Sequence, residues 1–162
     1  VLFTTCLVLT IALMSIHVAA AEKGSPENPW FIGMSQCNLG EPWRVQMNAD
    51  IKKAADAHKE IKVIYQDAQN DTLKQRSHLE EFVSAAVDLI IVSPKEAAPL
   101  TPPVAKAFEQ GIPVIVLDRR VVGDQYTCFI GADNKAIGEA AGRWRGRTRR
   151  TPRCSRRAAL CR

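Results

Sequence analysis

The sequence predicts an α/β fold with a doubly wound parallel sheet, and three observations support this prediction. Short apolar runs of strand length alternate with longer segments of helical periodicity. The run at 89–92 is continuously apolar, as expected for a strand covered by helices on both faces. The connecting segments have the lengths of right-handed βαβ units. At 162 residues, the chain has room for one domain of ordinary size.

The first half of the predicted sheet consists of two strands and two amphipathic helices. Residues 30–34 form the first strand and residues 61–65 the second. Between them, residues 43–59 form a helix whose apolar stripe contains Met47, Ile51, Ala54, Ala55 and His58. After a turn at 67–71, Asn70 or Asp71 caps the next helix. The stripe of that helix contains Leu79, Phe82, Val83 and Ala86.

The second half continues the alternation after the strand at 89–92. Thr101 is expected to cap the third helix, with Pro102 at its first position and Gly111 ending it. A strand at 114–117 and a short strand at 128–130 follow. Residues 135–142 then begin another helix.

The amino-terminal segment differs from the rest of the chain. Residues 1–18 are almost entirely apolar and uncharged, and three alanines precede Glu22. This pattern predicts a secretory signal peptide at 1–21, with an uncleaved membrane anchor as the alternative. Residues 22–29, which contain Gly and Pro, form a leader into the first strand. Either reading predicts an exported domain.

The carboxyl-terminal segment, 143–162, contains nine Arg and no acidic residue. The preceding residues carry 13 basic and 17 acidic side chains, so the net charge of the body is −4 although that of the chain is +5. We interpret this tail as an out-of-frame segment. A nucleic-acid-binding tail is the alternative, because arginine clusters neutralise phosphates. No nucleic-acid partner is predicted for the body.

The reactive side chains predict neither a metal site nor a cofactor. Of five Cys, Cys37 and Cys128 lie in the body, and whether they pair is left open. No CxxC occurs, and His58 and His78 fall on predicted helices, where solvated or packing roles are expected. The sequence has no GxGxxG or P-loop after a strand and no GxSxG, so no enzyme is predicted.

Two polar clusters follow strands of the predicted sheet. Residues 35–44 follow the first strand, and Asp118-Arg119-Arg120 follow the strand at 114–117. Ligands of open α/β sheets bind outside the carboxyl ends of the strands, so these clusters can share one site. An aromatic face, a guanidinium and a carboxylate are the groups that hold a sugar, by stacking and by charge-assisted hydrogen bonds to hydroxyls.

Four motifs carry a resemblance to a known family. They are Gly33-Met34-Ser35-Gln36 followed by Pro42-Trp43-Arg44, then Asp67-Ala68-Gln69-Asn70-Asp71, then Ile112-Pro113-Val114 with Leu117-Asp118-Arg119, and finally Ile130-Gly131-Ala132-Asp133-Asn134. In this order, residues 30–143 resemble the amino-terminal lobe of the type I periplasmic sugar-binding proteins of ABC importers, the ribose- and galactose-binding group.

The resemblance implies a ligand-binding set. Trp43 is expected to stack on the sugar, Arg44 and Arg119 to donate to its hydroxyls, and Asp118 to accept from them. Nearby, Glu41 and Asn38 are further candidates. Alternatively, Trp43 packs at a helix start and Asp118 forms a surface ion pair with Arg119. The loop is longer than in the ribose-binding members, so ribose is not assumed.

The resemblance also implies how the chain is organised. Residues 30–133 are expected to form the first lobe, and Asp133 and Asn134 to mark the hinge. Residues 134–142 are expected to contain the hinge and the start of the first helix of the second lobe. The rest of the second lobe is expected to be missing from the chain. The second lobe supplies about half of the contacts in this family, so we expect this chain to bind its sugar weakly or not at all.

The expected partners are a monosaccharide and, through the full-length protein, an inner-membrane ABC permease; the protein is expected to be a periplasmic monomer. A periplasmic receptor coupled to a membrane kinase or chemoreceptor is the alternative. A transcription regulator is disfavoured, because a secretory segment stands in place of a helix-turn-helix.

Overall fold

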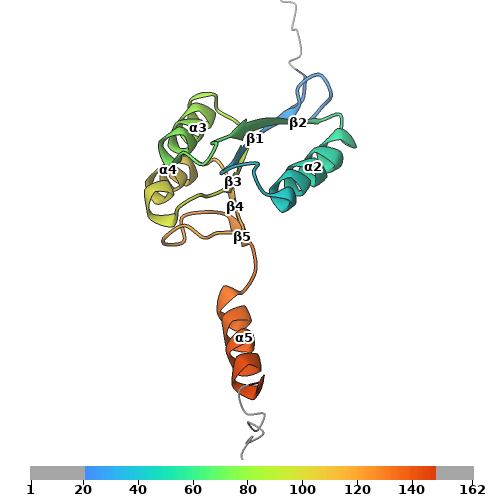
Figure 1. Cartoon of the computed structure of the whole chain (residues 1–162). Coiled ribbons are helices and arrows are strands. Elements are labelled where there is room, and N and C mark those ends of the chain that lie inside the picture. The colour runs from blue at the N-terminus through green and yellow to red at the C-terminus, as the bar shows by residue number, and fades with distance from the viewer. Residues whose placement is uncertain (1–20, 149–162) are drawn as a thin grey trace, which may run out of the picture.

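The computed structural model describes residues 21–148 and confirms the predicted parallel α/β sheet (Figure 1). Its strands pair in the order β2-β1-β3-β4-β5, and every pairing is parallel. They are β1 (Trp30–Gln36), β2 (Ile61–Asp67), β3 (Leu89–Ser93), β4 (Val114–Leu117) and β5 (Cys128–Ile130). The chain runs from β1 outward to β2 and then returns to β3, so the topological switch point lies between β1 and β3.

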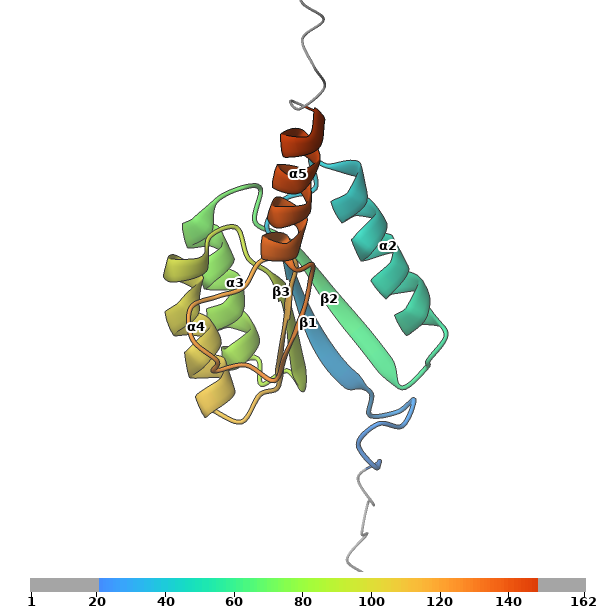
Figure 2. The same ribbon diagram turned by 90° about the horizontal axis from the view of Figure 1, so that it is seen from below.

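Helices cover both faces of the sheet. The helix α2 (Pro42–Asp56) lies on one face, and α3 (Thr72–Ser84) and α4 (Ala97–Glu109) lie side by side on the other (Figure 2). The main core lies between the sheet and these last two helices. It contains Leu79, Phe82, Ile90, Val92, Leu100, Val104, Val114 and Val116, all at most 2% exposed.

The cap predicted between β2 and α3 is confirmed at Asp71. Its Oδ1 accepts hydrogen bonds from the amides of Leu73 and Lys74, at 2.8 and 3.1 Å. These bonds satisfy amides that have no partner within the helix. They also hold the pKa of the Asp71 carboxyl below its ordinary value.

The predicted start of α4 is wrong, whereas its predicted end is confirmed. The helix begins at Ala97, one turn before Thr101, and contains Pro102 and Pro103 in its interior. The earlier start places Leu100, which is fully buried, on the helix face that enters the core. The Thr101 hydroxyl donates to the Ala97 carbonyl at 2.9 Å instead of capping the helix. At its other end, α4 stops before Gly111, which has a φ of +84°.

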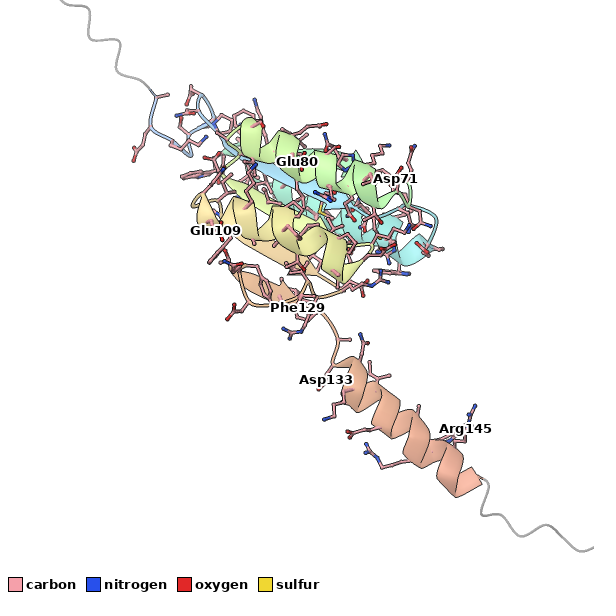
Figure 3. All side chains as sticks on the ribbon, turned by 90° about the vertical axis from the view of Figure 1, so that its left-hand side faces the viewer. Asp71, Glu80, Glu109, Phe129, Asp133 and Arg145 are labelled. Carbon is pink, nitrogen blue, oxygen red and sulfur yellow. The ribbon has the colours of Figure 1, made fainter. Side chains whose placement is uncertain are left out.

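Two other helix boundaries differ from the prediction. Because α2 ends at Asp56, His58 lies in the following turn, where its Nδ1 is 3.1 Å from Glu60 Oε1. The last helix, α5 (Asn134–Thr148), does not stop at Gly142, because the Arg residues that follow are good helix formers. Figure 3 shows α5 extending away from the sheet and its helices.

Parts of both distinctive ends lie outside the described residues, namely 1–20 of the predicted signal peptide and 149–162 of the arginine-rich tail. Within residues 21–148, no helix has the length and apolar character needed to span a bilayer.

His78 gives the fold a pH dependence that can be measured. This side chain on α3 is buried, with Nδ1 3.2 Å from Ser35 Oγ, and burial lowers the pKa of His78 below its ordinary value of 6.5. The unfolded chain therefore binds this proton more readily, so stability is lost as the pH falls through 6.5 toward the lowered pKa of the folded state. We expect the urea midpoint to be lower at about pH 5.5 than at about pH 7.5.

The matched variant is His78→Gln, which keeps a polar group beside Ser35 but cannot titrate. It is expected to flatten the pH dependence of the urea midpoint over this interval. An unchanged dependence in the variant would assign the effect to other groups.

Candidate functional site

The candidate site lies at the carboxyl-terminal edge of the sheet, beside the switch point between β1 and β3. Three chain segments meet there: the loop after β1 with the first turn of α2, the end of β3, and the turn after β4. Parallel strands bring their carboxyl ends to one edge, which is why residues distant in sequence converge.

Arg44 is the centre of this arrangement. It is 5% exposed and lies in the first turn of α2, which begins at Pro42, a favoured first residue of a helix. Its Nε donates to Glu41 Oε2 at 3.0 Å. Its Nη1 donates to Gln36 Oε1 at 3.2 Å and to Ser93 Oγ at 3.1 Å. A buried guanidinium needs such acceptors, because an unpaired buried charge is strongly destabilising.

The remaining nitrogen of Arg44 faces the turn after β4. Its Nη2 lies 3.6 Å from Asp118 Oδ2, an ion pair that is longer than a hydrogen bond. The guanidinium carbon lies 4.1 Å from the centroid of the Trp43 ring, so the two groups stack. Arg44 thus joins an aromatic side chain and a carboxylate that come from different segments.

Asp118 has an uncommon backbone conformation. Its φ is +63°, and the amide of Arg119 donates across it to the carbonyl of Leu117 at 2.7 Å. This three-residue turn with positive φ is strained for a residue other than Gly, although Asp tolerates it better than most. The Asp118 amide donates to the Ile130 carbonyl at 2.8 Å, which ties the turn to β5. Strain of this kind is found preferentially at functional sites.

Within residues 21–148, three pockets adjoin this edge, and Asp118 lines two of them. The first, of about 790 Å³, is lined by Asp118, Arg119, Arg120, Phe129, Gly131, Ala132, Asp133, Asn134 and Lys135. The second, of about 530 Å³, is lined by Trp43, Gln46, Met47, Asp50, Ile51, Leu117, Asp118, Ile130 and Gly131. The third, also about 530 Å³, is lined by Asn38, Leu39, Gly40, Glu41, Asp67, Gln69 and Asn70.

The structure brings some of the predicted binding residues together and separates others. Trp43, Arg44, Glu41 and Asp118 form one connected group. Next to this group, Arg119 lines the first pocket and its Nη1 is 3.5 Å from the Pro94 carbonyl.

The other predicted residues lie outside this connected group. Asn38 is not part of the group, because its Oδ1 accepts from the amide of Gly40 at 2.9 Å and so closes its own turn. At the predicted hinge, Asp133 Oδ1 accepts from the amide of Ala136 at 3.0 Å, as a helix cap does, and Asn134 is the first residue of α5.

Gln36, Ser93 and Arg120 contribute to the site although the sequence pattern predicted no binding role for them. The first two are fully buried polar side chains at the ends of neighbouring strands, and a polar residue directly after an apolar run was the signal available. Arg120 stacks on Phe129 with its guanidinium carbon 4.0 Å from the ring centroid, and its Nη1 lies 3.2 Å from Tyr126 Oη.

Cys37 and Cys128 are both free thiols. Cys37 is buried at the edge of the site, and burial raises the pKa of its thiol, an effect that the neighbouring Arg44 charge opposes in part. Cys128 is exposed on β5. Within residues 21–148, no group of His, Cys, Asp and Glu is arranged to hold a metal ion.

Comparison with known proteins gives one family match and several relatives. The periplasmic binding protein domain matches residues 32–151. The ribose import binding protein of Bacillus subtilis (strain 168) is 30% identical, over 83% of this chain and 46% of its own length. The galactofuranose-binding protein of Escherichia coli (strain K12) is 28% identical, over 83% of this chain and 43% of its own length.

Solved structures agree with these matches. The fructose binding periplasmic domain of a hybrid two component system superimposes with a TM-score of 0.70 at 39% identity, covering 74% of this chain and 39% of the other. A galactofuranose binding protein gives a TM-score of 0.67 at 29% identity, covering 74% and 41%. The chain therefore spans less than half the length of each of these relatives.

Proposed function

Because this chain belongs to the periplasmic binding protein family, we propose that it captures a neutral monosaccharide in the periplasm as part of the substrate-binding component of an ABC importer. The observation that carries the proposal is the connected group of Trp43, Arg44 and Asp118 at the switch-point edge of the sheet. The permease partner, the periplasmic location through a signal peptide at 1–21, and a monomeric state belong to the same proposal.

The charges of the site favour an uncharged ligand. Arg44 is flanked by the carboxylates of Glu41 and Asp118, and Arg119 adds a second positive charge beside the latter. The four formal charges of this set cancel, so a sugar acid or phosphate gains little net attraction. A hydroxyl can donate to a carboxylate and accept from a guanidinium, so a neutral polyol matches a site that offers both.

The geometry also suits a ring with hydroxyl groups. Arg44 covers one face of Trp43, which is nevertheless 45% exposed and lines the pocket shared with Asp118. The uncovered aromatic surface is available for an apolar face of a sugar. The gap of 3.6 Å between Arg44 Nη2 and Asp118 Oδ2 leaves both groups able to bond to ligand hydroxyls.

A sensory role is the second candidate function. It is favoured by the structural similarity to a periplasmic domain of a hybrid two component system, at 39% identity. The same lobe would serve either role. A permease and an ATPase encoded next to this gene would support import, and a membrane kinase or chemoreceptor would support sensing.

The test is an NMR titration of the chain with neutral pentoses, hexoses and cyclitols, because this method detects weak as well as tight binding. We expect saturable shifts at the Trp43 indole and at the Asp118 and Arg119 amides. Glucuronate, which is negatively charged, is expected to bind more weakly than the corresponding neutral hexose. Absence of saturable shifts at these positions with every neutral sugar would refute the proposal that this lobe holds a sugar without further contacts.

A further inference from the structure

Two buried side chains outside the predicted ligand set hold the guanidinium of Arg44. Gln36 and Ser93 are register partners at the carboxyl ends of the adjacent parallel strands β1 and β3, and both are 0% exposed. Each accepts a hydrogen bond from Nη1 of Arg44, at 3.2 and 3.1 Å. The two acceptors therefore use both hydrogens of one guanidinium nitrogen.

The orientation of the Gln36 amide is itself fixed. Its Nε2 donates to Asn48 Oδ1 on α2 at 3.2 Å, and its Oε1 also accepts from the amide of Cys37 at 3.2 Å. The donor end thus points to the helix and the acceptor end to Arg44. A buried glutamine on a strand is costly unless all of these bonds are made, so Gln36 serves this connection rather than packing.

We propose that Gln36 and Ser93 are positioning residues for sugar binding, an inference that rests on the proposed function. With Nε held by Glu41 and Nη1 held by these two acceptors, the planar guanidinium has one orientation left. In that orientation Nη2 faces Asp118 and the plane stacks on Trp43. The two residues act through Arg44, whose donor they keep aimed at the ligand before the ligand arrives.

The test combines affinity with the order of the Arg44 side chain. A guanidinium held by three acceptors rotates slowly about its Cζ–Nε bond and gives separate Nη signals in heteronuclear NMR spectra, whereas a mobile one gives averaged signals. We expect Gln36→Leu to average the Arg44 signals and to raise the sugar Kd about tenfold or more. Ser93→Ala is expected to do the same to a smaller extent.

Two variants separate positioning from general destabilisation. Gln36→Glu keeps an acceptor for Nη1, with Asn48 able to turn its amide, and should restore the Arg44 signals and most of the affinity. Ser35→Ala is the matched control for Ser93→Ala: this serine is also 0% exposed at the end of β1, but it contacts His78 on the opposite face of the sheet. It should leave the Arg44 signals and the affinity unchanged. If Gln36→Leu does not fold, the two serine variants carry the test.

The outcomes distinguish this inference from the proposed function. Unchanged Arg44 signals in both Gln36→Leu and Ser93→Ala overturn the inference, whether or not a sugar binds. Averaged signals with unchanged affinity overturn it as well, because the position of Arg44 would then not matter to the ligand. If the unsubstituted chain has an ordered Arg44 but binds no neutral sugar, the proposed function fails, and the positioning role in sugar binding fails with it.

Discussion

Replacing Asp118 with asparagine is expected to raise the Kd for the sugar about hundredfold and to leave the fold intact. Asn has the same size and tolerates the positive φ of +63° at this position, so the strained turn is retained. The carboxylate loses its charge, and with it the charge-assisted bonds to ligand hydroxyls, worth about 1.5 to 3 kcal/mol each. The change in the free energy of unfolding should be about 1 kcal/mol or less, because the Asp118 side chain is 37% exposed.

The matched control is Asp124→Asn. Asp124 is an exposed acid of the same loop, between β4 and β5, so its substitution changes the net charge equally. It should leave the affinity within a factor of about two. Similar losses in both variants would mean that the charge of the loop, rather than the carboxylate at the site, determines binding. If Asp118→Asn retained its affinity for the sugar, the Asp118 carboxylate would not be a ligand-binding group.

Local patterns were sufficient to predict the sheet and most of its helices. Alternating strand and helix periodicities determine the order of elements, and the capping bonds of Asp71 depend only on residues two and three positions later. The start of α4 was wrong because a local signal, Thr101 followed by Pro102, competed with the burial of Leu100. The core contact prevailed, since packing routinely overrides capping preferences.

The candidate site was predictable in its aromatic and charged members but not in its internal contacts. Trp43, Arg44 and Asp118 follow strands whose carboxyl ends must share an edge, so topology alone brings them together. Which polar group satisfies which donor depends on the register of β1 against β3, and no local pattern encodes the pairing of Gln36 with Ser93. Asn38 lies outside the connected group because its Oδ1 accepts from the amide of Gly40 in its own turn, and its predicted role in binding stays a prediction.

Replacing Gly33 is expected to destabilise the fold strongly, because this position brings β1 close to α3. Gly33 lies on an interior strand of the sheet, paired with Ile64 on one side and Ile90 on the other. A Cβ added there would lie 2.6 Å from two atoms of the Phe82 ring, which is 2% exposed in the main core. We expect Gly33→Ala to lower the free energy of unfolding by about 1 to 3 kcal/mol and Gly33→Val to lower it further.

A double-mutant cycle identifies the cause of this loss. Phe82→Ala removes the Cγ and Cδ atoms that the new Cβ would meet, so Gly33→Ala should cost less in the Phe82→Ala background, with a coupling of about 0.5 to 3 kcal/mol. Gly138→Ala on α5 is the control, because nothing lies within 4 Å of the added Cβ and Ala favours a helix. Urea unfolding of the four cycle members and this control provides the measurement. Strict additivity would show that Gly33 is required for a reason other than its contact with Phe82.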